Sequence, residues 1–299
     1  MNYDKVYTLE NIENINFSSY DFRLSDDVVS IINTLETKVS SPSYSRTPNF
    51  KKKKFDSEWG SIRNFKVTKI LDVKSCMDEL FNQLRESLNK LTKDNFDNNS
   101  KKIIDKISEF DVNSENITQI CNLIFDTSSK NGFYSEVYAN LCKKLIEKYP
   151  IMNLIIKDEF EKYKVMFDNI NYVDPNVDYD EFCKNNKENE TRMSIGKFFT
   201  NLMNNNIISY EKIYELVLTL QNNLYNNQND IDERKKNDMY VENISNIIQV
   251  GHEKLKQHPN WELIYKKIEY LSNIDTKKHK GISSKCVFTY MDILEYLNK

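Results

Sequence analysis

The segment "CMDELFNQLRESLNKLTKDNF" (residues 76–96) contains one amphipathic helix, a turn and the start of another helix. Its apolar residues recur three and four positions apart as far as Leu91, which places them on one face of a helix. Thr92 or Asp94 can start the next helix, because short polar side chains accept hydrogen bonds from free backbone amides. The segment therefore predicts a helical hairpin.

The same apolar spacing continues to the end of the chain and predicts a series of helices. Its segments are 76–91, 117–125, 136–146, 152–167, 195–203, 210–224, 239–250, 261–271 and 285–297. One further helix is expected at residues 25–39, with Ser25 as its N-cap. Helices joined by short polar loops form antiparallel hairpins, and stacked hairpins form an α-solenoid. We expect an all-α fold of this kind, although the periodicity also fits a plain helical bundle.

The composition excludes several classes of fold and partner. The 299 residues include only five glycines and five prolines, which argues against the turn-rich sandwiches, barrels and Rossmann-type units. A net charge of −3 excludes a polyanion-binding field over the whole molecule. The five cysteines form no C-x-x-C pair, and neither a signal peptide nor an apolar run of membrane-spanning length is seen. We expect a cytoplasmic protein without membrane contact.

The chain has no recognisable catalytic or cofactor-binding motif. Its three histidines, at positions 252, 258 and 279, are not spaced as metal ligands, and neither a P-loop nor G-x-S-x-G occurs. Cys121 and Cys142 fall on apolar helix faces, where buried side chains are expected rather than nucleophiles. We therefore expect a binding or scaffolding protein with no catalytic residue, metal or cofactor.

Residues 1–68 differ from the helical part and are expected to be an arm or linker, with the helical domain at 69–299. The run "KKKK", Lys51, Lys52, Lys53 and Lys54, lies beside aromatic residues. Lysines can contact phosphates while aromatic rings stack on bases, so the run is a candidate contact for mRNA. A solubilising linker is the alternative interpretation.

Three sequence blocks resemble a known family. The blocks are "LNKLTKDNF" (88–96), "LIFDTSSKNGFYSEVYANLC" (123–142) and "MSIGKFFTNLM" (193–203). In this order they resemble the middle domain of the eukaryotic translation initiation scaffold, initiation factor 4 gamma, over roughly residues 72–299. The resemblance implies about five antiparallel helical hairpins of the HEAT type. The resemblance is to a short form of this family. A protist, or a large cytoplasmic DNA virus that infects a protist, would suit such a form.

The resemblance implies a scaffold that binds and activates a DEAD-box RNA helicase, initiation factor 4 alpha, by holding its two lobes in a productive orientation. Leu88, Leu91 and Phe96 match positions implicated in helicase binding. Trp59 matches a tryptophan before the domain, and Tyr134 stands where the family has phenylalanine. For Leu88 and Leu91, packing inside the hairpin is an equally good interpretation.

The chain departs from the family pattern at several positions. Lys93 replaces a proline that the family places at the first turn of a helix, where proline is favoured but not required. Gly132 stands where proline is common, and the block around Gly196 is shorter than in the family. "YANLC" (138–142) is interpreted as structural, since Ala139 allows helices to approach closely.

The arm contains a candidate motif for a cap-binding protein. Such proteins recognise Y-x-x-x-x-L-Φ as a short helix in a groove. In "YTLENIENI" (7–15), Tyr7 takes the tyrosine position, Ile12 replaces leucine, and Ile15 adds an aliphatic side chain. Glu13, however, occupies the position that should be apolar. The alternative is a short amphipathic segment that docks on its own domain.

Two functions from different classes remain open. The first is a monomeric scaffold within a heteromeric complex that joins a helicase, a cap-binding protein and mRNA. The second is a related middle-domain adaptor that acts on another DEAD-box helicase in mRNA surveillance, splicing or poly(A)-protein regulation. A helical adaptor unrelated to RNA is compatible only if the three blocks match by coincidence.

Overall fold

The computed structural model describes residues 24–39, 76–109 and 114–299. The chain separates into two units, Met1–Ile70 and Leu71–Lys299, and each is described by itself. In the first unit, α2 (Asp26–Val39) confirms the helix expected at 25–39. The Ser25 carbonyl accepts hydrogen bonds from the amides of Val28 and Val29 at 2.9 and 3.1 Å, so Ser25 stands where the N-cap was predicted.

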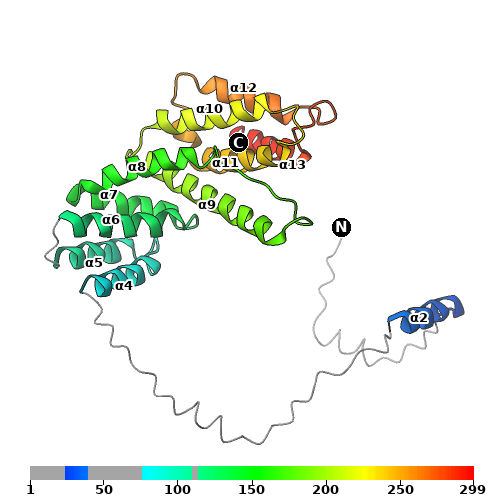
Figure 1. The fold of residues 1–299 in the computed structure, drawn as a ribbon, viewed down its shortest axis with the longest axis horizontal. Coiled ribbons are helices and arrows are strands. Elements are labelled where there is room, and N and C mark those ends of the chain that lie inside the picture. The colour runs from blue at the N-terminus through cyan, green and yellow to red at the C-terminus, as the bar shows by residue number, and fades with distance from the viewer. Residues whose placement is uncertain (1–23, 40–75, 110–113) are drawn as a thin grey trace, which may run out of the picture. The chain divides into compact units, whose positions relative to one another are not determined.

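The described part of the second unit consists of ten helices without a strand (Figure 1). They are α4 (Cys76–Asn89), α5 (Phe96–Glu109), α6 (Ser114–Ser129), α7 (Ser135–Lys148), α8 (Ile151–Val165), α9 (Tyr179–Asn204), α10 (Tyr210–Asn226), α11 (Arg234–Leu255), α12 (Trp261–Ser272) and α13 (Ser284–Leu297). The all-α class predicted from the apolar spacing is confirmed.

The ten helices pack as five consecutive hairpins in two layers. The inner layer contains the second helix of each hairpin. In it α5 packs on α7, α7 on α9, α9 on α11, and α11 on α13. In the outer layer α4 packs on α6, α6 on α8, and α10 on α12. This regular alternation is consistent with an α-solenoid. The outer layer is interrupted between α8 and α10, which do not pack closely against each other.

α5, which begins at Phe96, is the second helix of the predicted hairpin. One helix is much longer than the apolar spacing predicts, because the expected segment begins at 195, whereas α9 begins at Tyr179. The first half of α9 is polar, and it buries Asn185, Asn189 and Arg192 where apolar residues would be expected. Asp178 caps this helix by accepting a hydrogen bond from the amide of Glu181 at 3.0 Å.

Helices α9 and α11 pack closely against each other, and glycine allows it. A Cβ atom on Gly251 of α11 would lie 2.5 Å from Thr200 Cγ2 and 2.8 Å from Met203 Cε, both on α9. A Cβ atom on Gly196 of α9 would lie 2.5 Å from the hydroxyl of Tyr163 on α8. These distances are shorter than van der Waals contact, so the helices approach only because the side chains are absent.

We predict that Gly251→Ala destabilises the second unit. Overpacking costs about 1–3 kcal/mol, which outweighs the gain of about 1 kcal/mol from replacing a helical glycine. Urea unfolding followed by circular dichroism should show a net loss of up to about 2 kcal/mol. Gly132→Ala is the control, because the nearest atom to its Cβ would be the rotatable hydroxyl of Ser194, at 3.1 Å, and the next would lie at ordinary contact distances of 3.4 and 3.5 Å. Equal stability of Gly251→Ala and the parent chain would contradict the prediction.

Candidate interaction site

The turn between α4 and α5 is closed by one asparagine side chain. Asn95 Oδ1 accepts a hydrogen bond from the amide of Thr92 at 2.9 Å, and Asn95 Nδ2 donates to the carbonyl of Lys90 at 2.8 Å. The helix begins at the next residue, Phe96. Asn95, rather than the predicted Thr92 or Asp94, therefore stands before the helix. An amide side chain can donate and accept at once, which suits it to close this turn.

Leu88 and Leu91, predicted as candidate helicase contacts, are core residues. Their exposed fractions are 0% and 1%. The hydroxyl of Tyr138 on α7 donates to the Leu88 carbonyl at 3.1 Å and holds the end of α4 against α7. Of the two interpretations of these leucines, burial supports the packing one, because a fully buried side chain presents no surface to a partner.

Phe96 lies at the edge of the core, where it is half-buried. The ammonium of Lys144 on α7 lies 4.5 Å from the centre of its ring, at the range of a cation–π contact. The same ammonium lies 2.9 Å from a carboxylate oxygen of Asp97. Lys93 in the turn pairs with Glu136 at the start of α7, at 2.6 Å. Both ion pairs are solvent-exposed, so each contributes little to stability and can be displaced by a partner.

The turn between α6 and α7 presents two adjacent aromatic rings. Tyr134 is half-buried, and its amide donates to Asn131 Oδ1 at 3.2 Å. Phe133 is 86% exposed, and its ring packs edge-on to Tyr134 with 4.8 Å between the ring centres. We define the hairpin-end surface by five residues on these two turns: Lys93, Phe96, Phe133, Tyr134 and Glu136. Sequence reasoning missed Phe133, since periodicity cannot say which turn residue is exposed.

The structure brings the three sequence blocks together. The first block contacts the second through Tyr138 and Leu88, as described above. The second contacts the third through Asn201 on α9, whose side-chain amide donates to Ser135 Oγ at 2.9 Å. In "YANLC", Ala139 and Cys142 are fully buried, which confirms the structural interpretation of that stretch. The blocks therefore form one packed region instead of three separate surface motifs.

Several predicted site residues lie outside the described residues, where the structure does not test them. These are Tyr7, Ile12 and Ile15 of the cap-binding motif, Trp59, and the lysines at 51–54. The boundary expected between residues 68 and 69 lies outside them as well. All of these remain predictions from the sequence.

The described cysteines show no sign of activation as nucleophiles. Cys121 and Cys142 are buried as expected. Burial raises the pKa of the Cys121 thiol to about 11. Burial, and then the neighbouring Cys121, raise the pKa of Cys142 further. A nucleophilic thiol needs a lowered pKa and access to substrate, and these two have neither.

We predict slow labelling of the buried thiols of Cys121 and Cys142. In a Cys76→Ser background at about pH 8, a disulfide reagent should modify the exposed Cys183 rapidly, and Cys121 and Cys142 only after unfolding in urea. Mass spectrometry of digested protein would locate the label. Rapid labelling of either buried thiol in the folded chain would contradict the burial described here.

Comparison with known proteins identified no relative: no family model matches the chain, and no curated protein does. In the part of the chain that the structure describes, histidine, cysteine and acidic residues form no group of three or more that could hold a metal ion. No described helix is both long and apolar enough to span a membrane.

Proposed function

We propose that this chain is a translation-initiation scaffold that binds a DEAD-box RNA helicase through the hairpin-end surface. The observation that carries the proposal is the exposed Phe133, which lies beside Tyr134 immediately before α7, the helix whose Lys144 contacts the ring of Phe96. Exposed aromatic rings on the same surface as two weak, solvent-exposed ion pairs have the composition of a protein interface, which combines aromatic anchors with polar groups. The sequence blocks that resemble the initiation factor include this surface.

The proposed mechanism is that of a rigid adaptor. A helicase with two mobile lobes hydrolyses ATP only when both lobes are correctly oriented, and a packed helical stack can hold them without moving itself. The free energy of helicase binding at the aromatic anchors then offsets part of the entropy that the helicase loses when its lobes close. The chain contributes no catalytic group in this mechanism, and the ATPase chemistry belongs to the helicase.

The test is stimulation of the RNA-dependent ATPase of an initiation-type helicase by the purified chain. Phe133→Ala and Phe96→Ala should each weaken helicase binding about tenfold or more, as expected for aromatic anchors. Phe288→Ala is the matched control, because Phe288 is also a largely exposed aromatic residue, at 62%, but lies on α13. If the chain changes neither the ATPase rate nor helicase binding, the proposal is wrong.

The arm adds a second proposed interaction, recruitment of a cap-binding protein through Tyr7, Ile12 and Ile15, with the lysines at 51–54 contacting mRNA. In a pulldown with purified cap-binding protein, Tyr7→Ala and Ile12→Ala should each remove most of the binding. Glu13→Leu should strengthen it, because the groove expects an apolar residue there. Unchanged binding in all three variants would exclude this motif without affecting the helicase proposal.

A further inference from the structure

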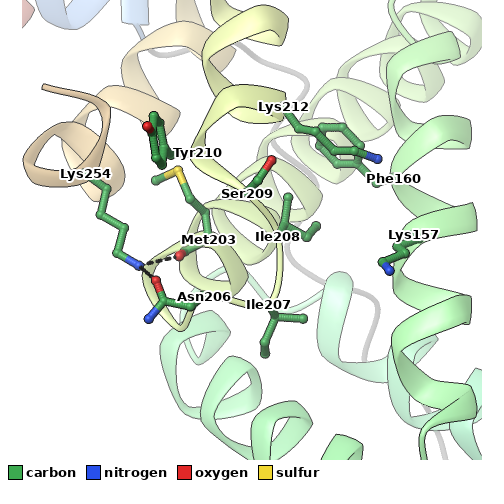
Figure 2. A pocket seen from close by; sticks show the side chains of 10 residues that line it. All are labelled: Lys157, Phe160, Met203, Asn206, Ile207, Ile208, Ser209, Tyr210, Lys212 and Lys254. Carbon is green, nitrogen blue, oxygen red and sulfur yellow. Dashed lines mark hydrogen bonds between the residues drawn. The ribbon is translucent and has the colours of Figure 1, made fainter. Parts of the chain in front are cut away.

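A pocket of about 430 Å³ lies where the outer helix layer is interrupted, between α8 and α10 (Figure 2). Residues of α8, the loop after α9, the start of α10 and the end of α11 line it. Its volume is within the usual range of ligand pockets, about 300–1,000 Å³. The α8–α10 pocket lies on different helices from the hairpin-end surface, so what it binds is a separate question.

The end of α9 builds the floor of this pocket. Asn206 has a left-handed φ of 61°, and its amide donates to the Met203 carbonyl at 2.9 Å. The amide of Ile207 donates to the Leu202 carbonyl, also at 2.9 Å. These two bonds are the Schellman arrangement of a helix C-terminus, with asparagine in the position that glycine usually takes. The motif fixes the backbone as far as Ile207, and the side chain of Ile208 is buried at 5% exposure, so the aliphatic floor is preformed.

Three lysines surround the floor: Lys254 on one side in Figure 2, and Lys157 and Lys212 on the other. No aspartate or glutamate is among the residues that line the pocket. Lys212 pairs with Glu161 at 3.2 Å, but Lys157 and Lys254 form no ion pair with any described residue. The pocket thus has a basic rim with positive charge left uncompensated.

Lys254 is the most constrained of the three. Its ammonium donates to the Met203 carbonyl at 2.8 Å and to Asn206 Oδ1, both neutral oxygens, which leaves one of its three donors without a partner among the described residues. Burial, and then the nearby Lys143, lower the pKa of Lys254. A carboxylate bound at the rim beside Lys254 would attract both Lys254 and the nearby Lys143. It would thereby compensate the repulsion between these two ammonium groups.

We propose that the α8–α10 pocket binds an acidic peptide segment of a partner protein, which inserts an aliphatic side chain onto the floor while its carboxylates pair with the lysine rim. The aliphatic floor favours a peptide over RNA, since bases bind best on exposed aromatic faces. Tyr210 is the partly exposed aromatic residue of the lining, and its ring is already packed edge-on to His258, with 5.9 Å between the ring centres.

The experiment is selection of displayed random peptides of about twelve residues on the full chain, with counter-selection on a Lys157→Glu, Ile207→Glu variant. Selected peptides should combine aspartate or glutamate with leucine, isoleucine, valine or methionine. Fluorescence anisotropy should show each binding at least about tenfold more weakly to the variant. Binding should also weaken when NaCl is raised from about 50 to about 300 mM, because salt screens exposed charge pairs.

Lys157→Glu alone keeps the test independent of folding, because the side chain is exposed and forms no described hydrogen bond or ion pair. Lys187→Glu, at an exposed position in the first half of α9, is its control for equal change in net charge. Peptides without acidic residues, peptides that bind the variants equally, or failure to select any peptide would each overturn the proposal. Tighter and equally variant-sensitive binding of oligouridine would replace it with an RNA site.

Discussion

The packing of α11 on α9 is the contact on which the rest of the second unit depends. Both helices also contact other helices of the stack: α9 packs on α7 and α8, and α11 packs on α10 and α13. Their approach requires the missing side chain of Gly251 opposite Thr200 and Met203. Since an interior at protein density cannot absorb an added methyl group without moving a helix, this one approach fixes the relative position of the hairpins on either side.

Both proposed binding surfaces inherit their geometry from α9. Asn201 on α9 holds Ser135 at the start of α7, directly after Tyr134 of the hairpin-end surface. Three residues further along α9, the helix ends in the motif that presents Ile207 and Ile208 to the α8–α10 pocket. Neither surface therefore needs to order itself on binding, which reduces the conformational entropy lost when a partner docks.

The sequence predicts the helical segments that bury apolar side chains, and it misses the segment that buries polar side chains. Leu80, Leu84 and Leu88 recur at helical spacing and are fully buried, so α4 was predictable from hydrophobicity alone. The first half of α9 buries amide and guanidinium groups, which periodicity interprets as solvent-exposed. The hairpin-end surface was only partly predictable. Resemblance identified its turns, but whether a turn residue faces solvent or core depends on tertiary contacts that lie far away in the sequence.

The polar side chains between α9 and α11 explain why these helices meet in one register. Asn243 on α11 donates to Asn189 on α9 at 3.1 Å, and Asn189 donates to Glu242 at 2.6 Å. Apolar contacts tolerate sliding of one helix along another, but a buried hydrogen bond is lost after a shift of one residue, and its groups are then left unsatisfied. Arg192 on α9 also reaches α11, because its guanidinium is buried, at 3% exposure, and donates to the sulfur of Met239 at 3.8 Å. The network thus costs desolvation and gives in exchange a single alignment, which the proposed scaffold role would require if both proposed surfaces are to keep a fixed spacing.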